Sequence, residues 1–189
     1  MPPVFTTLLV VANVLIWLLS LGSDNVFFTY GFIPASPNVL AIPTAMFLHG
    51  DMWHLAGNMY FLGVFGNIIE TEWGPKKFAL LYAGGGVVAT LAHWVTAPDS
   101  AAPLVGASGA IAALMGAVAV AFPSEKVNLL GLLGPLFAFG HRNVLAPAGV
   151  VLLLWFLYQW WMMLGPAAES GIAWAAHVAG FVVGAVTAG

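Results

Sequence analysis

A few polar groups stand out in a sequence that is otherwise almost wholly apolar: Ser108, His177 and the pair formed by His54 and Asn58. His54 and Asn58 are four residues apart, so on a helix they share one face. A serine, a histidine and an imidazole-plus-amide pair are the parts that acyl transfer needs: a nucleophile, a general base and donors for an oxyanion. The chain has no cysteine, which excludes a thiolate nucleophile and a Cys-ligated metal.

Each of these groups also has a purely structural interpretation. The small residues around Ser108 could form a helix-packing surface, because small side chains let membrane helices approach closely. Gly180 and Gly184 form a Gly-x-x-x-Gly spacing, which also suits close helix packing. His177 could simply bond to a neighbouring helix. His54 and Asn58 could clamp a loop. Close packing of the helices that carry Ser108 and His177 would, however, also bring these two side chains together. His93 is the one rival for the role of the base.

The composition indicates that the solvent of this chain is lipid. Of its 189 residues 61% are hydrophobic and 6% charged, and the mean hydropathy is +0.98, whereas an average soluble domain is about 25% charged. A net charge of −3 with four basic residues offers no surface for nucleic acid. No metal, nucleotide or other cofactor is implied.

The apolar runs predict an all-α membrane protein with six transmembrane helices in a single domain over residues 1–189. A spanning helix needs roughly 20 mostly apolar residues. The runs are approximately 4–21, 52–69, 78–95, 108–122, 147–164 and 171–188.

The four basic residues set the expected orientation. Lys76 and Lys77 lie between the second and third runs, and Lys126 and Arg142 lie between the fourth and fifth. Because loops rich in Lys and Arg stay in the cytoplasm, both termini are expected there, in a multi-pass protein of a prokaryotic cell membrane.

The expected helices place the polar groups at one depth. Ser108 begins a run of about 21 Å at ~1.5 Å per residue, so it would lie roughly 10 Å below the outer edge of a core about 30 Å thick. Asn58 and His177 lie about 10 and 12 Å along their helices from the preceding acidic residues. The segment 101–107 would then enter the membrane as a re-entrant loop.

Three motifs occur in order along the chain. They are a His-x-x-x-x-His-x-x-x-Asn pattern from His49 through His54 to Asn58, a Gly-x-Ser-Gly pattern from Gly106 through Ser108 to Gly109, and an Ala-His-x-x-Gly-x-x-x-Gly pattern from Ala176 through His177 and Gly180 to Gly184. Together they resemble the motifs of the rhomboid intramembrane serine proteases, and the resemblance covers nearly the whole sequence.

The resemblance implies a role for each of these positions. Ser108 would be the nucleophile and His177 the base, while His54, Asn58 and the Ser108 backbone N–H would form the oxyanion hole. The supporting positions would be His49, Gly106, Gly109 and Gly180.

Two departures from the family pattern concern the support of the site. Residues 23–50 contain neither residue of the Trp-Arg pair that many members carry there. Ala112 occupies the position where some members have a tyrosine that stacks on the catalytic histidine. No Asp or Glu occurs from residue 100 to 123 or in the last run, which favours a Ser-His dyad over a triad.

The expected function is cleavage of single-pass membrane proteins near the external end of their transmembrane segments. The main alternative is a catalytically silent rhomboid-like protein that binds transmembrane helices for trafficking or quality control. A small transporter or channel would better suit internal repeats or an intramembrane carboxylate.

Overall fold

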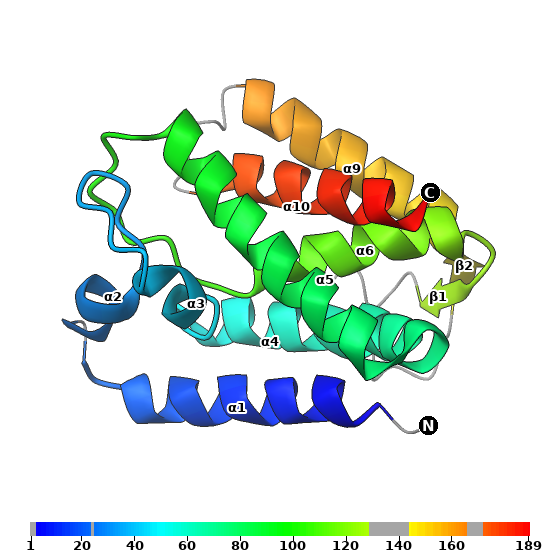
Figure 1. Cartoon of the computed structure of the whole chain (residues 1–189), viewed down its shortest axis with the longest axis horizontal. Helices are drawn as coiled ribbons and strands as arrows, with labels where there is room; N and C mark the ends of the chain where they lie inside the picture. Colours follow the sequence, from blue (N-terminus) through cyan, green and yellow to red (C-terminus); the bar gives the residue numbers. More distant parts are fainter. Residues whose placement is uncertain (1–2, 24, 129–143, 166–171) are drawn as a thin grey trace.

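The computed structural model describes residues 3–23, 25–128, 144–165 and 172–189, and most of them are helical. Figure 1 shows the long helices packed as one bundle. The helices are α1 (Val4–Ser20), α2 (Asn25–Tyr30), α3 (Ala41–Ala45), α4 (Met52–Phe61), the π-helical turn η1 (Leu62–Gly66), α5 (Asn67–Thr96), α6 (Ser108–Ala121), α9 (Ala148–Leu164) and α10 (Trp174–Ala188). Two short antiparallel strands, β1 (Lys126–Asn128) and β2 (Leu145–Pro147), lie between α6 and α9.

Helix α6 forms the centre of the bundle, with α5, α9 and α10 packed around it (Figure 1). Every residue from Gly109 to Val118 is buried, and most of these side chains are small, which lets the neighbouring helices approach closely. A Cβ added to Gly180 would collide with the Gly109 carbonyl, and one added to Gly184 would collide with the Ala113 carbonyl. The two glycines therefore allow α10 to pack directly against the backbone of α6.

The second and third expected helices are joined by a turn much tighter than the sequence suggested. Residues 70–77 were expected to form this connection, but helical structure continues through them except at Gly74, where φ is 82° and ψ is 167°. Pro75 follows as the first residue of the next helical run, a position where its missing N–H costs nothing. Figure 1 shows the chain reversing direction here, because glycine tolerates a positive φ.

A buried carboxylate fixes the beginning of α1. Glu70 accepts hydrogen bonds from the backbone N–H groups of Phe5 (2.8 Å) and Thr6 (2.7 Å) and from the Thr6 hydroxyl (2.8 Å). The first turn of a helix has N–H groups with no partner inside the helix, and Pro3 at the N-cap position supplies no side-chain bond. Glu70 therefore caps a helix that lies more than sixty residues away in sequence.

The connection between α1 and α4 is anchored by backbone pairing to the segment that precedes α6. Phe32 and Leu104 exchange two N–H···O bonds of 3.1 and 2.8 Å, and the Gly106 N–H donates to the Ala45 carbonyl at 2.9 Å. Phe32 is only 1% exposed and meets Trp94 edge to face at 5.9 Å between ring centroids. This pairing anchors the connection without a Trp-Arg pair, and it supplies partners to the extended backbone on which Ser108 depends.

The described helices give only partial support to the six membrane spans expected from the sequence. Among the described residues, one helical run, Met52–Thr96, is long and apolar enough to cross a membrane by length and composition, and four other apolar helices are shorter, at 10–17 residues. Large apolar side chains are exposed on α1 and α9, among them Leu8, Leu19, Leu154 and Leu164. Such surfaces suit lipid. Six complete spans and a re-entrant loop at 101–107 remain expectations from the sequence.

Candidate active site

Ser108 is the first residue of α6, and the backbone just before it has an unusual conformation. Gly106 has a φ of +116°, a region that residues with a Cβ rarely adopt, and Ala107 at the N-cap position gives no side-chain cap. The first N–H groups of a helix have no intrahelical partner and carry the positive end of its dipole. The N-terminus of α6 is therefore suited to stabilise negative charge beside the Ser108 hydroxyl.

His177 reaches this hydroxyl from the neighbouring helix. It is the fourth residue of α10, and its Nε2 lies 2.8 Å from the Ser108 Oγ. The expected start of the last helix at residue 171 lies outside the described residues; α10 begins at Trp174. Glu169, from which the depth of His177 was measured in the sequence, also lies outside them. The hydroxyl and the imidazole are nevertheless within direct hydrogen-bond distance, as a nucleophile and its base must be.

His54 and Asn58 lie against the backbone that leads into Ser108. A Cβ added to Gly106 would lie 2.6 Å from the His54 Nε2 and 3.5 Å from the Asn58 Nδ2. Asn58 is 7% exposed, and its Nδ2 has no hydrogen-bond partner among the described residues. Asp51 caps α4 by accepting from the His54 N–H at 2.9 Å. This fixes the start of the helix that carries both polar side chains.

The supporting residues expected from the sequence pack around the same place. His49 is fully buried and meets the His54 ring edge to face at 5.1 Å. Burial, and then the neighbouring His54, lower the pKa of His49 to about 4, so its ring is neutral at neutral pH. A Cβ on Gly109 would collide with Ala89 of α5, just as one on Gly180 would collide with the Gly109 carbonyl. The glycines are needed for close packing of the helices.

Gln159 of α9 also contacts the histidine, and the sequence did not identify it as a functional residue. Its Oε1 lies 2.8 Å from the His177 Nδ1, and the side chain is 5% exposed. Trp155 and Trp174 flank the same imidazole at 6.2 and 6.3 Å between ring centroids. These three residues surround the ring that Ala112 leaves without a stacking tyrosine. The hydrogen-bond partner of Ser108 is thus His177 and not the rival His93.

A signal for Gln159 was nevertheless present in the sequence. The buried and half-buried side chains of α9 include Leu152, Trp155, Phe156 and Gln159, which have the spacing of one helix face. Gln159 is the one amide in this apolar helix, and polar side chains in membrane helices usually face the protein interior. The aromatic residues around Gln159 obscure this signal, because they are equally typical of a surface for lipid contact and packing.

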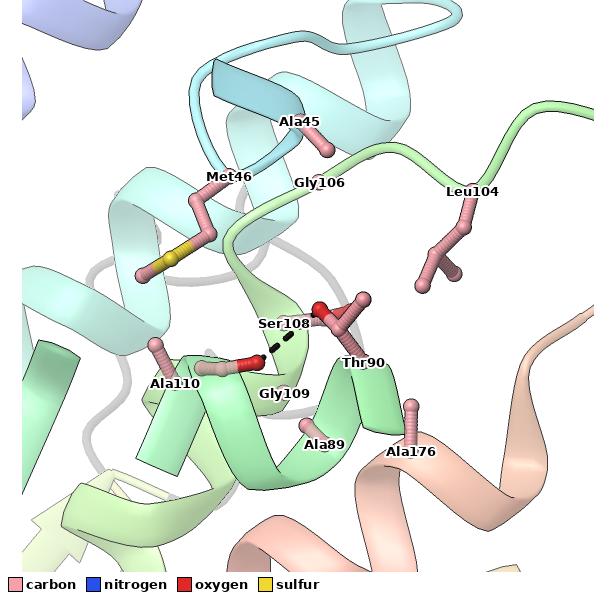
Figure 2. Close-up of a pocket in the computed structure, with 11 residues that line it drawn as sticks. Ala45, Met46, Ala89, Thr90, Leu104, Gly106, Ser108, Gly109, Ala110 and Ala176 are labelled. Carbon is pink, nitrogen blue, oxygen red and sulfur yellow. Dashed lines mark hydrogen bonds between the residues drawn. The ribbon is translucent and has the colours of Figure 1, made fainter. Parts of the chain in front are cut away.

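Figure 2 shows a cavity beside Ser108 that is bounded by small side chains. Ser108 and Thr90 contribute hydroxyl groups to it, and the Thr90 Oγ already donates to the Gly86 carbonyl at 3.0 Å. The rest of the lining is mostly apolar and includes Leu104, Gly109 and Ala176. Over the described ranges there is no group of three or more His, Cys, Asp or Glu side chains that could hold a metal ion.

The described residues thus form a helical bundle in which a serine and a histidine, each near the N-terminus of its helix, lie within hydrogen-bond distance. Sequence comparison then identifies the family. The rhomboid domain matches residues 36–189, so the chain belongs to the rhomboid family.

Three relatives illustrate the breadth of this similarity. The chain is 33% identical over 141 residues to the mitochondrial presenilin-associated rhomboid-like protein A of Danio rerio, covering 73% of this chain and 36% of the relative. It is 29% identical over 141 residues to the rhomboid protease GluP of Bacillus subtilis (strain 168), covering 70% and 27%. It is 43% identical over 68 residues to the chloroplastic rhomboid-like protein 11 of Arabidopsis thaliana, covering 36% and 24%. The matches therefore span about a quarter to a third of these longer proteins.

The comparisons contradict the expected localisation. The sequence analysis assigned the chain to a prokaryotic cell membrane, but relatives from Danio rerio, Bos taurus and Arabidopsis thaliana are mitochondrial or chloroplastic by name. The prokaryotic cell membrane is therefore withdrawn as the expected location. The distribution of four basic residues could not reveal this, because it bears on the orientation of helices and not on which membrane holds them.

Proposed function

We propose that this chain is an intramembrane serine endopeptidase, with six membrane-spanning segments, that cleaves transmembrane segments of single-pass membrane proteins. The observation that carries the proposal is the 2.8 Å distance between the Ser108 Oγ and the His177 Nε2. Membership of the rhomboid family, which includes the protease GluP, supports it.

The reaction begins with the Ser108 hydroxyl, which donates its hydrogen bond to the His177 Nε2. As the Oγ attacks the carbonyl carbon of the scissile peptide, a C–O bond forms and the proton passes to Nε2. When the tetrahedral intermediate collapses, the C–N bond breaks and His177 returns the proton to the leaving amine. Water then attacks the acyl-enzyme by the same route and regenerates Ser108.

The negative charge that develops on the carbonyl oxygen is stabilised by donors on two helices. The proposed donors are the His54 ring, the Ser108 backbone N–H and the Asn58 Nδ2, which has no hydrogen-bond partner among the described residues. The dipole of α6 acts in the same direction, because the N-terminus of a helix carries partial positive charge. No side-chain cap occupies this N-terminus. Donors fixed in place before the reaction stabilise the transition state without reorganising.

The site favours a substrate helix that is unwound near one of its ends. Ser108, His54 and His177 lie at or near the N-termini of α6, α4 and α10, which Figure 1 shows pointing the same way. Cleavage is thus expected near the substrate end at that side of the bundle. A helix hides its carbonyls in hydrogen bonds, so weak helix formers such as Gly or Pro should lie beside the scissile bond.

Lateral access for such a substrate is most direct past α9. Phe156 stacks on Phe181 of α10 at 4.8 Å, whereas Trp160 and Trp161 are 44% and 64% exposed. These aromatic contacts close the side of the site, so outward movement of α9 would admit a helix from the lipid. No cofactor enters the proposed reaction.

The test is labelling of the purified protein with a fluorophosphonate probe in liposomes, together with cleavage of a single-span reporter. The wild type should be labelled and should cut the reporter, and Ser108→Ala should do neither while keeping its thermal stability. A folded wild type that is neither labelled nor active would overturn the proposal in favour of a catalytically silent protein that binds transmembrane helices.

A further inference from the structure

We propose that Gln159 is a positioning residue that holds His177 in the tautomer and orientation required to accept the Ser108 proton. This inference rests on the proposed protease activity and adds a third side chain, from a third helix, to the Ser108–His177 pair. The contact that carries it is the 2.8 Å distance between the Gln159 Oε1 and the His177 Nδ1.

The direction of this hydrogen bond determines the tautomer. A carbonyl oxygen of an amide can only accept, so the Nδ1 of His177 must carry the hydrogen. A neutral imidazole with its hydrogen on Nδ1 has an unprotonated Nε2. This Nε2 is the atom that faces the Ser108 Oγ at 2.8 Å. The opposite tautomer would donate to Ser108 and could not take its proton.

Packing holds the amide in place. Gln159 lies on the inner face of α9, four residues after Trp155, which contacts the same imidazole at 6.2 Å between ring centroids. Trp174 meets the ring edge to face from α10. With 5% of Gln159 exposed, water competes poorly for its oxygen, and an unpaired amide would be costly in this setting. The arrangement therefore limits rotation of the His177 ring.

An amide differs from a carboxylate in what it can contribute. Helices α6, α9 and α10 contain no Asp or Glu, so they offer no charge to stabilise an imidazolium. Gln159 supplies orientation and tautomer without adding a negative charge near the developing oxyanion. It also joins α9 to α10, so α9 must return to this contact after a substrate has entered before His177 is again held in its productive tautomer.

The first test is a series of substitutions at this position, assayed on the single-span reporter in liposomes. Gln159→Leu, which roughly keeps the volume but removes the oxygen, should lower kcat by about 10–100-fold with KM nearly unchanged. This is the size of the loss when the outer partner that orients a metal-bound histidine is removed. Gln159→Glu keeps an oxygen at the same reach and should recover most of kcat. Leu157→Ala, on the exposed face of α9, is the matched control and should leave kcat within about twofold.

The second test reads the tautomer directly and does not depend on proteolysis. Nitrogen-15 NMR of histidine-labelled protein, assigned with His177→Ala, should show the Nδ1–H form for His177 in the wild type and a mixture of tautomers in Gln159→Leu. An Nε2–H form in the wild type, or Gln159→Leu with unchanged kcat and unchanged tautomer, would overturn the inference. If the wild type has the Nδ1–H form but neither cleaves the reporter nor reacts with a fluorophosphonate, the protease proposal fails while the positioning contact stands.

Discussion

Replacing Gly106 with alanine should damage catalysis directly, because the added methyl group would press on the proposed oxyanion hole. The φ of +116° at this residue disfavours a Cβ, and backbone strain of this kind costs about 1–3 kcal/mol. The new methyl carbon would also lie 2.6 Å from the His54 Nε2 and 2.8 Å from its Cε1. The His54 ring would have to retreat by about 0.8 Å to reach an ordinary contact of 3.4 Å.

This displacement acts on the proposed oxyanion hole. A misplacement of about 1 Å can cost 10²-fold in rate, and loss of one oxyanion donor typically costs about 10²–10³-fold. We therefore expect Gly106→Ala to lower kcat by about 100-fold, with KM changed far less, and to lower the free energy of unfolding by about 1–3 kcal/mol.

The assay compares cleavage of the single-span reporter and thermal unfolding for Gly106→Ala and Gly57→Ala. Gly57 lies on α4 next to Asn58, and a Cβ there would meet nothing within 4 Å. Its replacement should leave kcat unchanged and stabilise the helix by about 0.5–1 kcal/mol. A Gly106→Ala protein with a kcat within about threefold of the wild type would refute the assignment of this segment to the oxyanion hole.

Further predictions separate chemistry from packing. Asn58→Ala should lower kcat by about 10²–10³-fold with little change in the thermal midpoint, and lost stability with intact kcat would instead indicate a structural clamp. Glu70→Ala removes the acceptor of three hydrogen bonds at the start of α1. It should lower the free energy of unfolding, measured by denaturation, by about 2 kcal/mol. The folded fraction should keep its kcat, measured by active-site titration. Gly184→Val inserts a side chain against the Ala113 carbonyl and so separates α10 from α6. It should destabilise the bundle by about 1–3 kcal/mol or more and slow cleavage. Unchanged fluorophosphonate labelling of Gly184→Val would contradict this link between packing and catalysis.

The helical segments were predictable because their signal is local. Apolar runs of spanning length predict helices wherever they occur, and α1, α6 and α9 begin within a residue of the expected positions. The turn inside α5, at Gly74, was less predictable. Residues 70–77 contain several charges, which suggested a loop, yet a single glycine at a positive φ followed by proline is enough to reverse the chain.

The connection before α4 shows where local reasoning was insufficient. No residue pattern predicted α2 or α3, and without a Trp-Arg pair no residue stood out as an anchor for this segment. The anchor is the backbone pairing of Phe32 with Leu104, residues separated by more than seventy positions. Backbone hydrogen bonds between distant segments leave almost no trace in side-chain composition.

The sequence by itself indicated a lipid environment and a helical fold, and it identified Ser108, His177, His54 and Asn58 as candidate site residues. These conclusions follow from residue type, spacing and hydropathy, which are properties of the chain alone. Only the tertiary structure decided that Gln159 meets the His177 Nδ1 and that Glu70 caps α1. Both contacts join helices far apart in sequence, and their partners are chosen by which faces of the helices pack together. That choice depends on the close approach of α10 to α6 at Gly180 and Gly184, which places the imidazole beside the serine and fixes what else can reach it.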